Sequence, residues 1–153
     1  MNPGKVFEDE VQGLFELNGL SFTREGSKRT YGLSHSGKGK CDFLLDKSAI
    51  ECKTIDIDTN LRMPWPGTKN TPIKAHQLKA LREYHRKGFV AGILIELRRK
   101  DKLYWLDIDK LNNIIMDKGM VKALTNDILS EYAKELTMLA DIVEIIRTNN
   151  GII

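Results

Sequence analysis

The sequence is poor in cysteine and has no long apolar run. Its two cysteines, Cys41 and Cys52, are too few for a disulfide framework, so we expect buried thiols in a reducing compartment. No stretch approaches the ~20 apolar residues of a membrane span, and the N-terminus lacks the apolar segment of a signal peptide. A phosphate-binding loop of the GxxxxGK[ST] type is also absent. We therefore expect a cytoplasmic protein with no membrane contact and no nucleotide cofactor.

The composition suits one soluble globular domain. Of its 153 residues, 41% are hydrophobic and 29% are charged. The net charge of +3 is unevenly distributed, because residues 20–102 hold 18 Lys and Arg against 9 Asp and Glu, whereas the remainder holds 6 against 12. A basic middle between acidic ends indicates a surface for a polyanion such as nucleic acid. Chance clustering on an ordinary solvated surface is an equal alternative.

Hydrophobic periodicity and turn residues predict a mixed α/β domain in the order α-β-β-β-α-β-β-α-α. The segment 25–40 is basic and rich in glycine, and the segment 55–72 holds three prolines and is long for a loop. The last predicted helix carries a long apolar stripe that would cover the sheet or join two subunits. Helices are predicted at 4–18, 73–86, 111–116 and 121–147, and strands at 20–24, 41–45, 48–54, 89–97 and 103–108.

Residues 41–53 predict a β-hairpin with one charged face. With a two-residue turn at 46–47, Phe43 lies opposite Ile50 and Asp42 lies opposite Glu51. Directly opposed residues point to the same face, with Cβ atoms ~5 Å apart, so the two carboxylates face each other. The other face would pack against helices and holds Cys41, Phe43, Leu45, Ile50 and Cys52.

The facing carboxylates indicate a metal site. Asp42 and Glu51 repel each other unless a cation lies between them, and a hard divalent ion such as Mg²⁺ takes oxygen ligands. Lys53, on the same face, would orient or deprotonate an attacking water, or stabilise charge on a phosphate. The alternative is an ordinary solvent-facing hairpin in which Lys53 forms a salt bridge with the two acids.

Asp42 followed by the Glu-Cys-Lys triplet at 51–53 resembles the D-x(n)-ExK signature of the PD-(D/E)xK nuclease superfamily. Three further segments, in the same order along the chain, resemble RecU-type Holliday junction resolvases and their phage relatives. They are the GKVFE opening at 4–8, a helix with a His-Gln pair within 72–78, and a closing strand pair within 89–107. The helix predicted at 121–147 has no counterpart in the resemblance.

The resemblance implies a restriction-endonuclease-like mixed β-sheet flanked by helices, with an extra C-terminal helix. A single nuclease domain would span residues 1–153, with its core at about 4–110 and a helical extension at 111–153. The implied activity is a Mg²⁺-dependent endonuclease, with Mn²⁺ as a substitute, that resolves four-way DNA junctions in a bacterial or phage-infected cell. Symmetric cutting of a four-way junction needs two sites related by a twofold axis, so a homodimer is expected. The alternatives are a general, restriction or repair nuclease of the same superfamily, and a basic DNA-binding module without catalysis.

The resemblance also assigns roles to single residues. The metal would be held by Asp42, Glu51 and an acid of the first helix, Glu8, for which Asp9 and Glu10 are close competitors. The expected catalytic residues are Glu8, Asp42, Glu51, Lys53 and Gln77.

Basic residues on both sides of the hairpin are expected to contact the DNA backbone. His76 would either touch DNA or lie on the surface without a role, and neither is favoured. Trp65, between two prolines, would stack on an unpaired base, although packing within the protein is the commoner role of tryptophan. The expected DNA-binding residues are Lys28, Arg29, Lys38, Lys40, Arg62, Lys69, Lys74, His76, Arg98 and Arg99.

Overall fold

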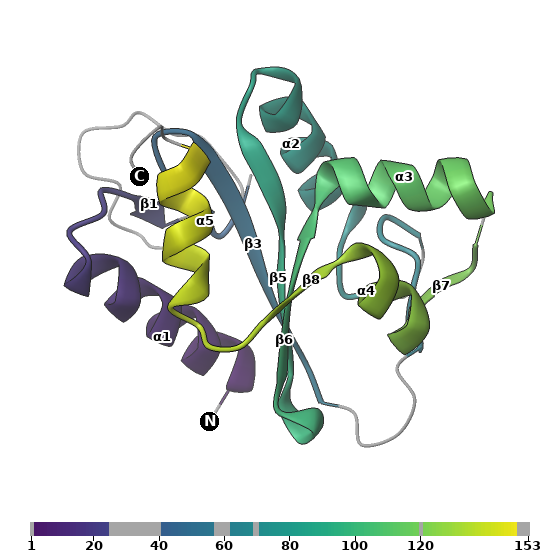
Figure 1. Cartoon of the computed structure of the whole chain (residues 1–153), viewed down its shortest axis with the longest axis horizontal. Coiled ribbons are helices and arrows are strands. Elements are labelled where there is room, and N and C mark those ends of the chain that lie inside the picture. Colours follow the sequence, from purple (N-terminus) through teal and green to yellow (C-terminus); the bar gives the residue numbers. More distant parts are fainter. Residues whose placement is uncertain (1, 25–40, 57–61, 69–70, 120, 150–153) are drawn as a thin grey trace.

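Figure 1 shows the computed structural model, in which a β-sheet lies between two groups of helices. The structure describes residues 2–24, 41–56, 62–68, 71–119 and 121–149. In these ranges the main sheet has six strands in the order β1-β2-β3-β5-β6-β8. β3 and β5 are parallel and the other neighbouring pairs are antiparallel, so the sheet is mixed. The strands are β1 (Thr23–Arg24), β2 (Phe43–Leu44), β3 (Ser48–Ile55), β5 (Val90–Leu97), β6 (Lys102–Asp107) and β8 (Lys134–Leu136).

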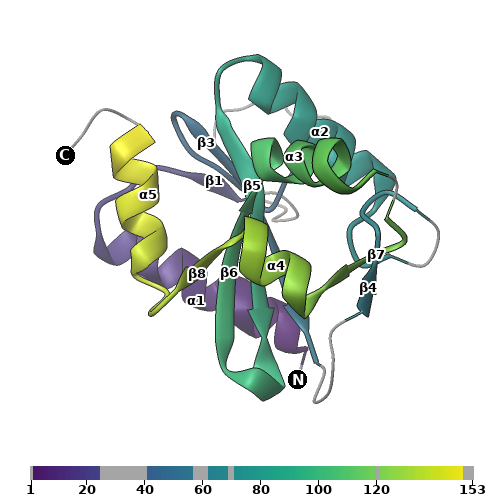
Figure 2. The same ribbon diagram turned by 45° about the vertical axis from the view of Figure 1, so that its right-hand side comes forward.

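Helices cover both faces of this sheet. The described helices are α1 (Pro3–Leu17), α2 (Ala75–Arg86), α3 (Ile108–Lys118), α4 (Asn126–Tyr132) and α5 (Asp141–Asn149). Figures 1 and 2 place α1 and α5 on one face, and α2, α3 and α4 on the other. A short 3₁₀ turn, η1 (Arg98–Lys100), joins β5 and β6, and β4 (Arg62–Pro64) pairs with β7 (Ala123–Thr125) in a separate two-stranded sheet. The predicted α/β class with a mixed sheet is therefore confirmed. Within the ranges given above, no helix combines the length and apolarity that crossing a membrane would need.

β3 and β5 form the centre of the sheet because both of their faces are apolar. Ile50 and Leu94 belong to the core on the α1 side, whereas Ala49 and Ile93 belong to the core on the α2 side. α2 makes the crossover between the two parallel strands. The central strand β3 carries Glu51, so this packing fixes the place of the predicted metal ligand.

Each face of the sheet has its own hydrophobic cluster. The cluster on the α1 side joins residues of α1, β2 and α5, and its rings include Phe15 and Phe43, whose centroids lie 5.3 Å apart in an edge-to-face contact. The cluster on the α2 side joins α2, α3 and α4, with Leu81, Leu111 and Leu129 fully buried. These clusters hold α1 and α2 against opposite faces of β3.

α1 begins where its sequence favours a helix start. The Asn2 side chain accepts hydrogen bonds from two backbone N–H groups of the first turn, and Pro3 takes the first helical position. The helix ends before Gly19, whose φ of +68° suits glycine. The predicted range of 4–18 is confirmed to within one residue at each end.

The C-terminal region does not form the single helix predicted at 121–147. β7, α4, β8 and α5 occupy this stretch instead. Ala133 has an extended backbone with φ −86° and ψ 154°, and residues 134–136 then pair with β6. Pairing satisfies the outer edge of β6, and this tertiary interaction overrides the helical pattern of the sequence. The extension is therefore mixed, and β8 makes it part of the main sheet.

The remaining predicted elements occur near their expected positions with different lengths. The strand predicted at 20–24 is reduced to β1, and the strand predicted at 41–45 is reduced to β2. α3 is longer than the predicted helix at 111–116. The region 55–72, predicted as an irregular loop, contains β4.

Candidate active site

The hairpin of β2 and β3 has the predicted register. Phe43 lies opposite Ile50. The backbone N–H of Leu45 donates to the carbonyl oxygen of Ser48 at 2.8 Å, which closes the predicted turn at 46–47. Because register and turn agree with the prediction, the two predicted carboxylates are brought to neighbouring positions on the hairpin.

The side chain of Asp42 ties this residue to β3. Its Oδ2 atom accepts a hydrogen bond from the backbone N–H of Cys52 at 2.8 Å. The chain bends at Asp42, and β2 begins at the next residue. The bend turns Cys41 into the α2-side cluster, whereas Cys52 lies in the α1-side cluster, so the predicted common face for the two cysteines is wrong. Both cysteines are buried, as expected, and neither forms a disulfide.

Glu51 is a buried carboxyl in the middle of β3, with 1% of its surface exposed. Burial, followed by the charge of Asp42, raises the pKa of Glu51 to about 8, and Lys53 opposes part of this rise. The alternative of a solvent-facing Glu51 is therefore wrong. At neutral pH the Glu51 carboxyl is largely protonated, and a cation beside it would be needed to stabilise the ionised form.

Lys53 and Gln77 contact the same oxygen of Glu51. Lys53 Nζ lies 3.2 Å from Glu51 Oε2, and Gln77 Nε2 donates to this atom at 3.0 Å. The amide oxygen of Gln77 accepts the backbone N–H of Lys74 at 2.8 Å, where α2 begins. This capping contact fixes the Gln77 side chain and directs its amide nitrogen to Glu51. Two predicted catalytic residues thus meet at the buried carboxyl.

Glu8 is the acid of α1 that interacts electrostatically with the hairpin. Burial and then the charge of Asp42 raise the pKa of Glu8, while Arg24 and Lys53 lower it. Burial of this side chain is partial, with 26% exposed. Glu8 therefore lies near enough to Asp42 for the two charges to interact.

Arg24 is a residue of the site that the sequence analysis did not identify. Its guanidinium nitrogens lie 3.5 Å from Glu8 Oε1 and 2.7 Å from Asp9 Oδ1. Arg24 therefore pairs with both Glu8 and its competitor Asp9, and the contact with Asp9 is the shorter one. No local motif signals this contact, because it joins β1 to a helix one element earlier.

Two of the predicted DNA-binding residues lie beside the site. Lys74 and His76 are exposed at the start of α2, within three positions of Gln77. They therefore lie on the same helical turn as Gln77, which contacts Glu51.

The other predicted DNA-binding residues are not placed at the hairpin by any described contact. Arg98 and Arg99 lie in η1 and pair with Asp56, at 3.8 Å from Oδ2 and 2.6 Å from Oδ1. Only the backbone of Arg62 is described, in β4. Lys28, Arg29, Lys38, Lys40 and Lys69 lie outside the described residues.

Trp65 packs inside the protein. It is 8% exposed and belongs to the α2-side cluster, where Ile73 and Leu78 are also buried. Its surface is therefore not available to stack on a base, and the commoner packing role applies.

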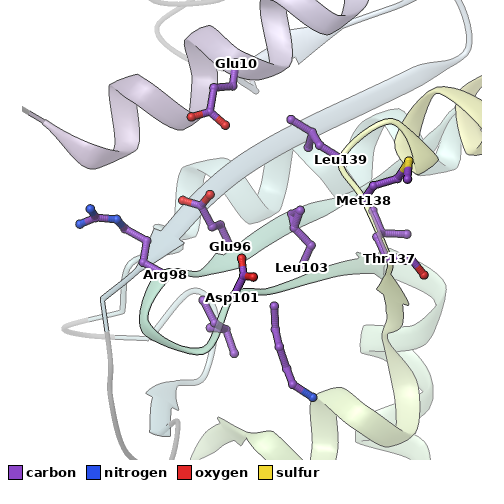
Figure 3. Close-up of a pocket in the computed structure, with 11 residues that line it drawn as sticks. Glu10, Glu96, Arg98, Asp101, Leu103, Thr137, Met138 and Leu139 are labelled. Atoms are coloured by element: carbon purple, nitrogen blue, oxygen red, sulfur yellow. The ribbon is translucent and has the colours of Figure 1, made fainter.

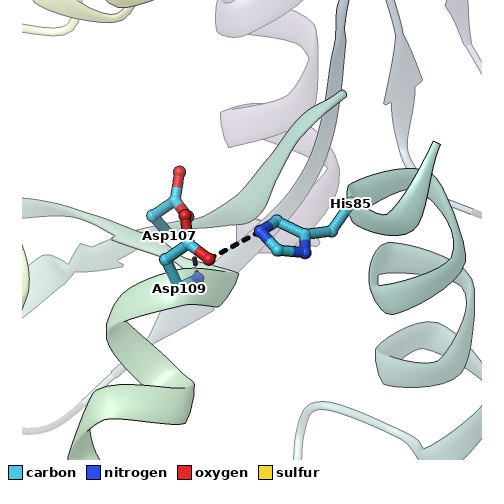
Figure 4. Close-up of side chains that lie close together, drawn as sticks. All are labelled: His85, Asp107 and Asp109. Atoms are coloured by element: carbon cyan, nitrogen blue, oxygen red, sulfur yellow. Dashed lines mark hydrogen bonds and ion pairs between the residues drawn. The ribbon is translucent and has the colours of Figure 1, made fainter. Parts of the chain in front are cut away.

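A second group of metal-binding side chains lies where α2 ends and α3 begins (Figure 4). His85 Nε2 lies 2.6 Å from Asp109 Oδ1, and Asp107 Oδ1 accepts the backbone N–H of Asp109 at 2.8 Å. These contacts connect the two helices and cap α3. They account for the cluster without a bound ion.

An open cavity lies on the α1 side of the sheet, and Figure 3 shows the side chains that line it. Its volume is about 370 Å³. Glu10, the other competitor of Glu8, lines it together with Glu96 and Asp101. Burial raises the pKa of Glu96, and the charges of Glu10 and Asp101 add smaller increases. Arg98 and Lys102 also line this cavity, so Glu10 belongs to a pocket of mixed charge away from the hairpin contacts.

The residue types at the hairpin suit a hard divalent cation, although their side chains are not gathered around one point. Glu8, Asp42 and Glu51 carry carboxylate oxygens, which are the ligand type that Mg²⁺ and Mn²⁺ accept. Among the described residues, the group whose ligand atoms all lie within 4.8 Å of one another is His85, Asp107 and Asp109, so Glu8, Asp42 and Glu51 would have to move closer together to share an ion. Burial and mutual repulsion disfavour the ionised form of Glu51, and a cation would relieve both effects.

No protein-family model matches the sequence, and no curated protein is significantly similar to it. Function is therefore inferred from the geometry and chemistry of the hairpin.

Proposed function

We propose that the protein is a Mg²⁺-dependent endodeoxyribonuclease that resolves four-way DNA junctions. The observation that carries the proposal is the buried Glu51 carboxyl, which Asp42 repels and which Lys53 and Gln77 contact. A buried carboxyl with a raised pKa beside a second carboxylate is the kind of group that occurs at catalytic and metal sites. Its neighbours are the residue types that hydrolysis of a phosphodiester requires.

The residues of the site would divide the chemistry. Glu8, Asp42 and Glu51 would hold Mg²⁺, which supplies Lewis-acid polarisation of the phosphodiester and of the attacking water. Gln77 orients Glu51, since its own amide is fixed by the cap of α2. Lys53 stabilises the negative charge that develops on the phosphate. Hydrolysis would leave a 5′-phosphate and a 3′-hydroxyl, as the resemblance to PD-(D/E)xK nucleases implies.

The arrangement of elements supports a restriction-endonuclease-like fold. An antiparallel hairpin, β2–β3, is followed by the crossover helix α2 and by β5, which is parallel to β3. Of the D-x(n)-ExK pattern, Glu51 and Lys53 lie on β3 and Asp42 directly precedes β2, while Glu8 lies on the preceding helix α1. Within this fold, we propose that the protein is related to RecU-type resolvases.

The decisive experiment compares DNA substrates and variants together. We would incubate the protein with Mg²⁺ and equal concentrations of four-way junction, flap, linear duplex and single-stranded DNA. The wild type is expected to nick opposing strands of the junction. Asp42→Asn, Glu51→Gln and Lys53→Ala are expected to lose cleavage but keep DNA binding, because affinity comes mainly from phosphate contacts elsewhere.

The matched control is Asp46→Asn, which removes an exposed acid from the turn of the same hairpin. It should cut like the wild type. Cleavage by Asp42→Asn at the wild-type rate would contradict the metal site. Equal cleavage of linear duplex and junction would favour a general nuclease over a resolvase.

A further inference from the structure

Arg24 connects the two chain segments that carry the predicted metal ligands. On one side its guanidinium lies 3.5 Å from Glu8 and 2.7 Å from Asp9, both on α1. On the other side it lies over the ring of Phe43, with 5.7 Å between Arg24 Cζ and the ring centroid. Phe43 is fully buried and directly follows Asp42. The guanidinium therefore lies between α1, which carries Glu8, and β2, which directly follows Asp42.

The contacts of Arg24 differ in length, and the difference indicates its role. The short contacts go to Asp9 Oδ1 at 2.7 Å and Gln12 Oε1 at 2.6 Å, whereas the contact with Glu8 is longer. Charge-assisted hydrogen bonds are strong near 2.7–2.9 Å. Arg24 therefore holds α1 mainly through Asp9 and Gln12, and its contact with Glu8 is the longer ion pair.

The surroundings of Arg24 favour a fixed side chain. It is 19% exposed and is held by two carboxylates, one amide oxygen and one aromatic face. The planar guanidinium can use all of these partners at once, which lysine could not.

We propose that Arg24 is a positioning residue that sets Glu8 against the hairpin for metal binding. This inference rests on the proposed function, because it assumes that Glu8 is a ligand. Residues that do not bind the metal but orient one of its ligands through a hydrogen bond typically contribute 10–100-fold to metal affinity.

The test measures Mn²⁺ binding, with electron paramagnetic resonance used to count free ion, for the wild type, Arg24→Ala and Arg24→Lys. We expect Mn²⁺ affinity to fall about 10-fold in Arg24→Ala. The fall should be smaller in Arg24→Lys, which keeps the positive charge but lacks the planar guanidinium with its several donors. The matched control is Arg147→Ala. Arg147 also holds α1, by donating to the carbonyl oxygen of Asn18 at 3.3 Å, but at the opposite end of the helix. Arg147→Ala should leave Mn²⁺ affinity unchanged.

A second comparison separates positioning from a general structural effect. In a Glu8→Gln background, Arg24→Ala should cause no further loss of Mn²⁺ affinity, because the ligand it positions is gone. Asp9→Asn should cause a smaller loss than Glu8→Gln, and Glu10→Gln should cause none. Melting temperatures identify variants that fail to fold, and Arg24→Lys then serves as the informative variant.

The outcomes distinguish this inference from the proposed function. If the wild type binds Mn²⁺ and Asp42→Asn does not, unchanged or tighter binding by Arg24→Ala overturns the role of Arg24 alone. The role of Arg24 is also overturned if Arg24→Ala causes a further loss of Mn²⁺ affinity in the Glu8→Gln background. If the wild type binds no Mn²⁺ and cuts no DNA, the proposed function fails and the inference fails with it.

Discussion

At the residue scale, Glu51 couples the stability of the fold to pH. Its pKa is about 8 in the folded chain, compared with an ordinary value of 4.5. Between these two values the folded protein holds a proton that the unfolded chain has released. Stability that this group contributes is therefore complete below about pH 4.5 and is lost as pH rises through 8.

We predict that metal-free Glu51→Gln becomes more stable than the wild type as pH increases from 5 to 8, because glutamine cannot ionise inside the core. Melting temperatures across this range would measure the difference. Glu16→Gln, on the exposed side of α1, should follow the wild-type curve. A wild type and a Glu51→Gln variant with parallel curves would contradict a raised pKa for Glu51. Mg²⁺ should raise the melting temperature of the wild type at pH 8 by binding the ionised form.

At the element scale, the contact between β5 and β6 depends on a missing side chain. Gly92 lies opposite Asp107, and a Cβ atom added to it would lie 2.6 Å from the carbonyl oxygen of Leu106 and 2.7 Å from the ring of Trp105. The close approach lets the Trp105 ring pack directly against the backbone of the strand beside β3.

We predict that Gly92→Ala destabilises the protein by about 1–3 kcal/mol, because neighbouring atoms would have to move. Gly13→Ala is the matched control, since Gly13 is exposed in the middle of α1 and a Cβ there meets nothing within 4 Å. That substitution should stabilise the helix by about 0.5–1 kcal/mol. Urea denaturation would measure both values, and a neutral Gly92→Ala would mean that β6 can shift.

The turn between β8 and α5 depends on one carboxylate. Asp141 Oδ2 accepts the backbone N–H groups of Thr137 and Met138 at 3.0 and 3.1 Å. This turn directs the chain from the edge of the sheet into α5, whose apolar side includes Ile142, Val143 and Ile146.

We predict that Asp141→Ala costs about 1 kcal/mol of folding free energy, because two backbone donors lose their partner at an exposed site. Glu144→Ala removes a second exposed acid from the first turn of α5 and should have little effect. Chemical denaturation would measure the free energy of unfolding of both variants. Equal losses would indicate that the negative charge near the start of the helix, rather than the turn, is what matters.

At the scale of the whole molecule, the proposed nuclease needs a basic surface around an acidic site. Lys74 lies beside Gln77 at the start of α2, and its side chain is exposed. The cavity on the opposite side of the sheet is lined by both acids and bases, among them Glu10, Glu96 and Arg98. Variants of Lys74 and of Arg98 with Arg99 therefore test from which side DNA would approach.

We predict that DNA affinity falls steeply with salt and that Lys74→Ala reduces the slope of log K against log salt by about 0.9, the value for one phosphate contact. Lys38→Ala with Lys40→Ala, and Arg98→Ala with Arg99→Ala, should also flatten the slope. Lys134→Ala, on the edge strand β8, is the control and should leave it unchanged. Fluorescence anisotropy over a salt series would measure the slopes. If the first three changes have no effect, the DNA surface lies elsewhere.

We also predict that the protein is a dimer in solution, since paired cuts on opposing strands of a four-way junction require two sites related by a twofold axis. Sedimentation velocity would measure the oligomeric state, and strand-labelled junctions would show whether the nicks are paired. A stable monomer that cuts linear duplex as fast as junctions would contradict the resolvase proposal and favour a general nuclease.

The sequence by itself determined the parts of the protein that depend on local interactions. The two-residue turn and strand alternation set the pairing of Phe43 with Ile50, and Asn2 with Pro3 set the start of α1. Gln77 was predicted as a site residue from a resemblance to a family motif, and the capping contact that fixes its side chain involves a residue only three positions away.

Only the tertiary structure decided the features that depend on distant segments. The burial of Glu51 requires α2 to pack over β3, and the role of Arg24 requires β1 to lie against α1. The apolar stripe of 121–147 was misread as one helix, because periodicity carries no information on whether β6 has a free edge for residues 134–136. Local propensity costs less to override than an unpaired strand edge or an uncompensated buried charge, so packing determined these features.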